Sequence, residues 1–276
     1  FLLGILLVLV YFVGCQADFV ARGFLFHPLK FPGGDWNISR KMENVSTEVS
    51  FYNTKKQLLN GRYFEYQKIV PDDTAQGSIL YCHGNAENIS NLNDFAFQIS
   101  RDFRCNVLIF DYAGYGKSEG EPTARGILDD GLNARNWLAA RDGIAQDKVI
   151  VYGQSLGGSV VIDIAAEGGA RGLIVESSFT SLGDMGRVLF PILPANYLLR
   201  ERLASVEKIG KVNCPVFISH GKPDKVIPFA QGKRLFENAN EPKTFYVPPS
   251  GCDYHSAPHC EEHRQKLKEF INKLPE

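Results

Sequence analysis

The stretch KVIVYGQSLGGSVVIDIAAE, residues 148–167, decides the fold. Its first five residues form a short apolar run typical of a buried strand, and the residues from Ser155 onward have the length and composition of a helix. Between them, residues 153–157 (GQSLG) fit the pattern G-x-S-x-G. Only glycines fit at both ends of a turn this tight, which projects the serine hydroxyl above the sheet. We therefore predict that Ser155 is a nucleophile; the alternative is a structural glycine turn with an idle serine.

The same alternation of short apolar runs and longer amphipathic runs extends from residue 77 to the C-terminus. Strands are expected at 77–82, 106–110, 148–152, 172–176, 215–219 and 244–247, and helices at 91–100, 122–141, 155–167, 229–238 and 261–274. Two earlier strands, 45–53 and 62–69, are expected to form a hairpin around Asn60-Gly61. This pattern predicts an α/β fold with a mostly parallel sheet covered by helices on both faces.

The composition is that of an ordinary globular domain. The chain has 276 residues, of which 44% are hydrophobic and 22% charged, enough for one large core. Its formal net charge of -1 gives no electrostatic reason to expect nucleic acid as a partner. Six cysteines are too few for a disulfide scaffold of this length, and Cys82, Cys105 and Cys214 are expected to be small buried side chains.

A catalytic serine needs a base, and the base needs an orienting carboxylate. In this fold class the acid follows the serine along the chain and the histidine comes last. Asp224 lies just beyond the expected strand 215–219, at the end of the sheet where such folds place their sites. We predict Asp224 as the orienting acid; the alternative is a turn aspartate that stabilises its own loop.

Two backbone amides are candidate donors to an oxyanion. The N–H of Leu156 directly follows the nucleophile at the start of a helix, where the potential is positive. The second donor is expected from the loop after strand 77–82, where we assign the backbone N–H of Asn85. His83, in the same loop, is then expected to be structural.

Five motifs in order resemble one family. They are HGNAENIS (83–90), FDYAGYGKSEGEP (110–122), YGQSLGG (152–158), ESSFTSLGDM (176–185) and HGKPDKVIP (220–228). From about residue 24 to the end, the chain resembles the membrane-linked α/β-hydrolase-domain serine hydrolases, the group containing protein depalmitoylases. The resemblance implies an eight-stranded sheet, a short lid, and hydrolysis of carboxylic esters or thioesters. It also implies Ser155 as nucleophile, Asp224 as acid, and Asn85 with Leu156 as oxyanion donors.

The histidine loop departs from that family. The family usually places glycine immediately before its catalytic histidine, whereas Gly251 lies four positions before His255. His255 matches the loop after the last strand best, and we predict it as the catalytic base. His259, which follows Pro258 and adjoins the final helix, is the alternative.

Two cysteines flank this loop. Cys252 and Cys260 could close a disulfide around the base in an oxidising compartment. A metal site would use Cys252, His255 and His259 with Cys260 or His263, but these spacings do not match the usual paired-ligand patterns, and a triad base cannot also bind zinc. No metal or other cofactor is expected.

Two further segments bear on substrate and location. Residues 178–212 are long for a connection and have an apolar middle, which indicates a small lid insert or an ordinary outer helix. Residues 1–14 are apolar and uncharged, so residues 1–20 are expected to be a signal peptide core or part of a membrane anchor, ahead of a hydrolase domain at 21–276. Cys15 ends a sequence similar to a bacterial lipobox and is a candidate for lipidation. Asp18 and Arg22 disfavour a buried N-terminal helix.

The sequence therefore predicts a membrane-associated or exported serine hydrolase of small-molecule or acylated esters and thioesters, acting through an acyl-enzyme. A serine peptidase of the same fold is one alternative. A catalytically silent binding protein that keeps the fold is the other, favoured only by the altered histidine loop. A serine rather than an aspartate at position 155 argues against a dehalogenase.

Overall fold

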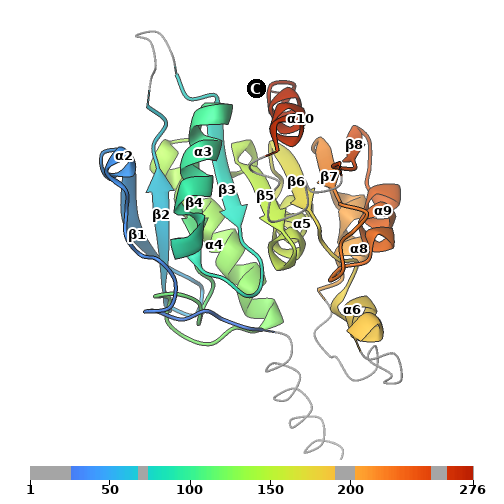
Figure 1. Ribbon diagram of the computed structural model, residues 1–276, viewed down its shortest axis with the longest axis horizontal. Coiled ribbons are helices and arrows are strands. Elements are labelled where there is room, and N and C mark those ends of the chain that lie inside the picture. Colours follow the sequence, from blue (N-terminus) through green and yellow to red (C-terminus); the bar gives the residue numbers. More distant parts are fainter. Residues whose placement is uncertain (1–25, 68–73, 190–202, 250–259, 276) are drawn as a thin grey trace, which may run out of the picture.

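A central sheet of eight strands organises the molecule (Figure 1). The structure is a computed structural model and describes residues 26–67, 74–189, 203–249 and 260–275. The strands are β1 (Ser46–Tyr52), β2 (Leu58–Phe64), β3 (Gly77–Cys82), β4 (Cys105–Phe110), β5 (Ile150–Gln154), β6 (Gly172–Glu176), β7 (Val216–Ser219) and β8 (Lys243–Tyr246). Their order is β1-β2-β4-β3-β5-β6-β7-β8. The first two pairings are antiparallel and the other five are parallel, which confirms the expected mostly parallel, eight-stranded sheet.

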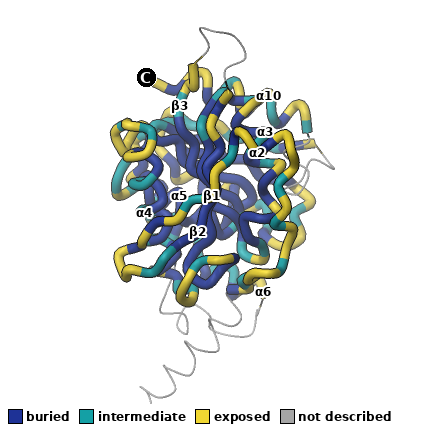
Figure 2. The backbone as a smooth tube through the Cα atoms, turned by 90° about the vertical axis from the view of Figure 1, so that its left-hand side faces the viewer, coloured by how far each residue is buried: buried dark blue, intermediate teal, exposed yellow. Residues whose placement is uncertain are grey.

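Helices cover both faces of this sheet. In the described ranges the α-helices are α2 (Arg40–Glu43), α3 (Asn93–Phe103), α4 (Ala124–Asp142), α5 (Leu156–Gly168), α6 (Leu182–Leu189), α8 (Ser205–Lys208), α9 (Phe229–Asn238) and α10 (Glu261–Ile271). Two hydrophobic clusters separate the faces: α4, α5 and α9 pack in one, and α3 and α10 in the other. Strands β2 to β7 are mostly buried between these layers, whereas the edge strands β1 and β8 are mostly exposed or half-buried (Figure 2).

Strand β5 shows how the sequence pattern produces the two layers. Successive side chains of a strand point to opposite faces. Val151 accordingly packs in the cluster of α4 and α5, while Ile150 and Tyr152 pack in the cluster of α3 and α10. Because both faces are covered, all five residues of the strand are buried, and the run is apolar up to its last residue, Gln154.

The expected hairpin turn is wrong in position. Asn60 and Gly61 lie inside β2, paired with Ser50 and Val49 of β1. The turn instead lies between residues 53 and 57, where the Asn53 amide donates to the carbonyl oxygen of Gln57 at 3.1 Å. Gly61 has another role: a Cβ there would lie 2.8 Å from the carbonyl oxygen of Ile109, so glycine lets β2 approach β4 closely.

The parallel arrangement brings several loops to one edge. Strands β3, β5, β6 and β7 are neighbours and parallel, so the loops that follow them meet at their carboxyl ends. Figure 1 shows α6 beyond this same edge. Ligand sites of open α/β sheets lie there. The candidate residues at 85, 155 and 224 follow β3, β5 and β7, so the topology gathers them.

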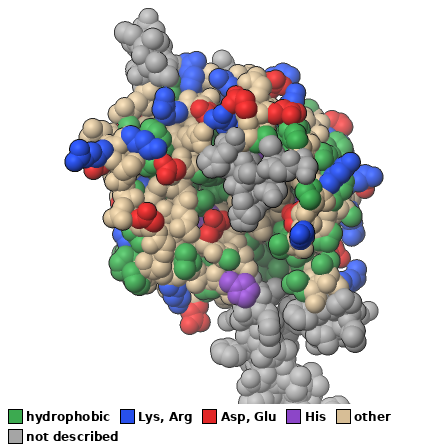
Figure 3. All heavy atoms as spheres, in the orientation of Figure 1, with side chains coloured by type: hydrophobic (Ala, Val, Ile, Leu, Met, Phe, Trp, Pro, Cys, Tyr) green, Lys and Arg blue, Asp and Glu red, His purple; other side chains and the backbone are tan. Residues whose placement is uncertain are grey.

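The surface carries charges of both signs. On the face shown in Figure 3, acidic and basic side chains are interspersed and neither sign dominates. This distribution matches the net charge of -1. Within the described ranges, no helix combines the length and apolarity needed to cross a bilayer. The predicted anchor, residues 1–20, lies outside those ranges.

Candidate active site

Ser155 lies at a strained turn between β5 and α5. Its φ of 52° and ψ of -113° place a non-glycine residue in a sparsely populated backbone region. The turn is tight on both sides: a Cβ on Gly157 would collide with the carbonyl oxygen of Cys82, and a Cβ on Gly153 would collide with that of Gly157. The two glycines of the motif are therefore required by close backbone approach.

Neighbouring strands hold this turn in place. The Ser155 N–H donates to the carbonyl oxygen of Glu176 at 2.9 Å, at the end of β6. The Ser155 carbonyl oxygen accepts from the hydroxyl of Ser178 at 2.7 Å and from the amide of Gly158 at 3.1 Å. A strained residue persists only where its surroundings over-determine it, and here both backbone groups of Ser155 are fixed. Ser155 itself is half-buried between buried neighbours.

The amide of Leu156 opens α5, a helix of 13 residues. The first amides of a helix lack partners within the helix and carry the positive end of its dipole. The oxygen of an acyl carbonyl attacked by Ser155 would develop its negative charge beside this helix end. Leu156 therefore keeps its predicted role as an oxyanion donor.

Asn85 lies in the loop after β3, which its side chain ties down. The Oδ1 of Asn85 accepts from the Tyr115 hydroxyl at 2.7 Å and from the His27 amide at 3.1 Å. These contacts fix the loop that carries the backbone amide of Asn85, which stays the second predicted oxyanion donor. In the same loop His83 is fully buried, with Nε2 3.5 Å from Oδ1 of Asp111, as a structural histidine would be.

Asp224 follows β7 in a loop that its own carboxylate organises. One oxygen accepts the amides of Val226 and Ile227 at 2.8 and 2.9 Å, and the other lies 3.4 Å from Nε2 of His220. Burial alone would raise the pKa of Asp224, but these hydrogen bonds outweigh it and lower the pKa below the ordinary value. The carboxylate is therefore anionic at neutral pH, as an orienting acid must be.

The histidine loop lies outside the described residues. This applies to His255, to the alternative base His259, and to Cys252, so their predicted roles stay predictions. Cys260 is disulfide-bonded, and its partner also lies outside the described residues. Within the described ranges, no group of three potential ligands could hold a metal ion.

Among the residues that the structure describes, Cys82, Cys105 and Cys214 are free thiols. The first two are buried, as the sequence predicted, and Cys214 is half-buried. Burial raises the pKa of all three thiols, which keeps them protonated and unreactive at neutral pH. They therefore offer no nucleophile to compete with Ser155.

Sequence reasoning missed a buried pair beside the nucleophile elbow, the turn at residues 153–157. Glu176, the last residue of β6, lies 2.7 Å from Nε2 of His263 in the first turn of α10. Both side chains are nearly inaccessible to solvent. The only signal in the sequence was a glutamate ending the apolar run GLIVE (172–176), where a charge needs a partner.

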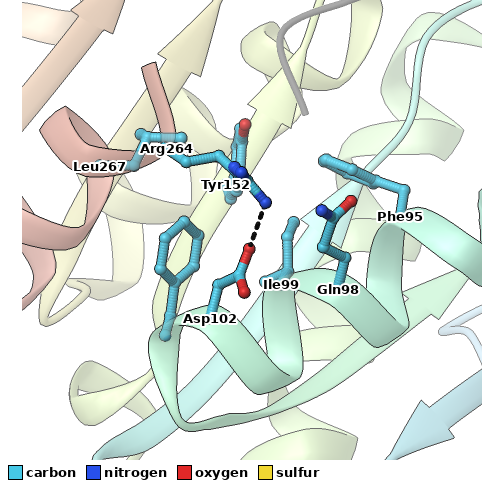
Figure 4. A pocket seen from close by; sticks show the side chains of 8 residues that line it. Phe95, Gln98, Ile99, Asp102, Tyr152, Arg264 and Leu267 are labelled. Atoms are coloured by element: carbon cyan, nitrogen blue, oxygen red, sulfur yellow. Dashed lines mark hydrogen bonds and ion pairs between the residues drawn. The ribbon is translucent and has the colours of Figure 1, made fainter. Parts of the chain in front are cut away.

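A crevice lies between α3 and α10, on the face of the sheet that these two helices cover (Figure 4). Arg264 of α10 reaches across it to Asp102 of α3 at 3.3 Å, and Tyr152 forms part of its wall. Its volume is about 10 Å³, room for about one water molecule. The crevice is too small for an acyl substrate.

Two curated proteins match most of the chain. The uncharacterized protein YfhR of Escherichia coli is 34% identical over 208 residues, which cover 73% of this chain and 72% of YfhR. Human alpha/beta hydrolase domain-containing protein 17B is 33% identical over 241 residues, which cover 86% of this chain and 79% of the human protein.

Solved esterases have similar structures. The Pyrococcus furiosus esterase Pf2001 matches with a TM-score of 0.69 at 18% identity, covering 90% of this chain and 99% of the esterase. The acetyl xylan esterase of Paenibacillus sp. R4 matches with a TM-score of 0.69 at 12% identity, covering 86% and 87%. At these identities the likeness concerns the fold alone.

A family model described as the α/β-hydrolase fold matches residues 77–168, the segment from β3 through the elbow to the end of α5. This segment contains the nucleophile turn and the loop of Asn85. The relatives extend the match to most of the chain. The chain therefore belongs to the α/β-hydrolase family of hydrolases.

Proposed function

We propose that this hydrolase cleaves carboxylic esters or thioesters through a Ser-His-Asp triad. The hydroxyl of Ser155 attacks the acyl carbonyl while His255 takes its proton. The amides of Asn85 and Leu156 donate to the oxyanion. The intermediate collapses as His255 protonates the leaving alcohol or thiol, which leaves an acyl-enzyme. Water, deprotonated by His255, then releases the acid and restores Ser155.

The single observation that carries this proposal is the backbone of Ser155. A non-glycine residue is held at a φ of 52°, fixed by a hydrogen bond to the Glu176 carbonyl and one from the Ser178 hydroxyl, and followed directly by a helix. Strain of this kind is a mark of functional sites. The anionic Asp224 supports the second part of the triad, since a lowered pKa suits a group that must stabilise an imidazolium.

Apolar side chains beyond the same edge support an acyl or lipid-like substrate. Val188 and Leu189, at the end of α6, are 42% and 57% exposed. Val226, in the loop of Asp224, is 68% exposed. We propose that they belong to the side of the site that receives the acyl group, with residues 178–212 as a small lid. A series of p-nitrophenyl esters tests this: Leu189→Ser should weaken hydrolysis of the octanoate more than that of the acetate, and equal effects would remove the proposal.

Membrane attachment is proposed to reside in residues 1–20. Their apolar composition supports an anchor or an exported lipoprotein modified at Cys15. The full chain should partition with membranes and a chain starting at residue 21 should not. Equal partitioning of the two would contradict this role.

The triad is tested by the intact mass of the protein after treatment with a fluorophosphonate probe. Wild type is compared with Ser155→Ala, His255→Ala and His259→Ala. We expect labelling to require Ser155 and His255 but not His259. Labelling that survives His255→Ala and fails in His259→Ala would identify His259 as the base. A folded wild type that is not labelled would favour the silent binding protein.

A further inference from the structure

The buried pair of Glu176 and His263 connects the C-terminal helix to the strand beside the nucleophile. Its oxygen and nitrogen lie 2.7 Å apart, and the side chains are 4% and 1% exposed. Among the described residues, neither of these two facing atoms has another hydrogen-bonding partner, and an isolated buried polar group is unfavourable, so the two side chains depend on each other. The pair joins α10 to the final residue of β6.

The surroundings leave the pair little freedom. The His263 ring stacks on Phe217 of β7 with an interplanar angle of 24°, and its centroid lies 5.1 Å from that of Tyr246 of β8. The hydroxyl of Tyr152, from β5, hydrogen-bonds Glu176. Side chains from four elements therefore fix the position of the Glu176 carboxylate.

The backbone of Glu176 is in turn a direct support of the nucleophile. Its carbonyl oxygen accepts the N–H of Ser155 at 2.9 Å. The next residue, Ser177, has a φ of 42° and donates its N–H to the carbonyl oxygen of Ser219 at 2.9 Å. The residue after it, Ser178, donates its hydroxyl to the carbonyl oxygen of Ser155. Ser155 and Ser177, both at positive φ, thus directly follow the adjacent strands β5 and β6, and each is bonded to or next to Glu176.

We infer that Glu176 and His263 are a positioning pair for Ser155. The pair anchors residue 176 through its side chain, and residues 176 and 178 hold the strained nucleophile through both of its backbone groups. The pair touches no reacting atom; it acts by keeping the Ser155 hydroxyl aligned. This inference rests on the proposed serine hydrolase function.

A short polar contact suits this task better than an apolar contact because it is directional. Apolar side chains can slide over one another with little change in free energy, whereas a short contact between two buried polar groups has a narrow optimum. A displacement of about 1 Å at a reacting group costs about 100-fold in rate. Loss of the pair should therefore lower the rate of the chemical step and leave substrate binding nearly unchanged.

The test compares Glu176→Gln, His263→Gln and their double variant with wild type. The readouts are kcat and KM for p-nitrophenyl acetate and the rate of fluorophosphonate labelling. Arg264→Gln is the matched control, because it removes a neighbouring ion pair of α10 that ends on Asp102 of α3 and not on the elbow. All variants are first shown to be folded by near-ultraviolet circular dichroism.

We expect each single variant to lose about 100-fold in kcat and in labelling rate, with KM within about threefold of wild type. The double variant should lose no more than either single variant, because the two residues act as one unit. Arg264→Gln should keep the rates of wild type. Folded single variants with unchanged kcat would overturn the inference, whatever their thermal stability.

Two further outcomes are informative. If the single variants do not fold, the apolar double variant Glu176→Met/His263→Leu replaces them. This variant removes both polar groups, so neither is left buried without its partner. Slow labelling of that folded variant supports positioning; a normal rate, or failure to fold, overturns it. A wild type with no hydrolysis dependent on Ser155 would remove the proposed function and this inference with it, whereas an active wild type with equally active variants removes only the inference.

Discussion

Two buried pairs of an acid and a histidine flank the nucleophile strand, and they are built differently. His83 and Asp111 follow β3 and β4, on one side of β5, and their nearest charged atoms lie 3.5 Å apart. Glu176 ends β6, on the other side of β5, and lies 2.7 Å from His263. The first pair joins two loops of the carboxyl edge, while the second joins the sheet to α10.

The acids differ in what supports them. The Asp111 carboxylate accepts the Ile89 amide at 3.0 Å, as well as facing His83. Burial raises the pKa of Asp111, and the hydrogen bonds from His83 and Ile89 oppose that rise. Burial would lower the pKa of His83, but the hydrogen bond and charge of Asp111 outweigh it and raise the pKa. Glu176 instead faces two side chains, His263 and Tyr152.

The difference determines how strongly each buried acid depends on its histidine. A backbone amide continues to support a carboxylate whichever side chain is replaced, so Asp111 keeps a donor when its histidine is lost. The Glu176 side chain is instead supported by two side chains, and one substitution removes its histidine partner. The free energy of unfolding should therefore respond more to loss of His263 than to loss of His83.

The largest effect is expected for His263→Leu. This change leaves the buried Glu176 side chain with the Tyr152 hydroxyl but without its histidine, which costs about 3–5 kcal/mol of unfolding free energy. Urea denaturation at neutral pH measures it. A loss below that of His83→Leu would reverse the proposed ranking of the two pairs.

A smaller loss is expected for His83→Leu. The Asp111 carboxylate keeps the Ile89 amide, so the cost is that of the lost polar contacts, about 1–3 kcal/mol. The same urea titration measures it. Asp111→Asn is the companion variant: if the amide of Ile89 carries the support, it should be no more destabilising than His83→Leu.

The apolar double variant Glu176→Met/His263→Leu should lie within about 1 kcal/mol of wild type. Replacing a buried ion pair by apolar residues of similar volume removes both desolvation costs, which offsets the lost attraction, and leaves mainly the Tyr152 hydroxyl without its acceptor. Differential scanning calorimetry checks the result. A loss as large as that of His263→Leu alone would mean that the contact between the two polar side chains itself stabilises the fold.

The smallest effect is expected at a third pair, His220 and Asp224, where the acid is partly exposed. The pKa of Asp224 is lowered in the folded state, so its stabilisation is complete above the ordinary value of 3.8 and is lost as pH falls through the folded pKa. Asp224→Asn should cost at most about 1 kcal/mol at pH 7 and should flatten the acid side of the stability curve. Urea midpoints between about pH 2 and pH 7 measure this. An unchanged acid slope would contradict the assigned cause.

Most elements could be predicted from local pattern. The strands 77–82 and 172–176 and the helix 229–238 begin and end as expected, because each is a run of uniform periodicity bounded by turn residues. The hairpin was misplaced because Asn-Gly is a common turn signal, whereas here Gly61 meets a backbone 48 residues away, that of Ile109. A contact between positions so far apart cannot be predicted from the residues around Gly61.

By itself, the sequence determined the order of strands and helices, the family, and the identity of Ser155 and Asp224 as candidates, because these depend on periodicity and on turns that only glycine permits. The tertiary structure alone decided that Glu176 meets His263 and that residues 176 and 178 support both backbone groups of Ser155. Those contacts join positions up to 87 residues apart, and only the packing of α10 against the sheet sets their distance. The free energy of a buried charge depends on that distance, and periodicity does not encode it.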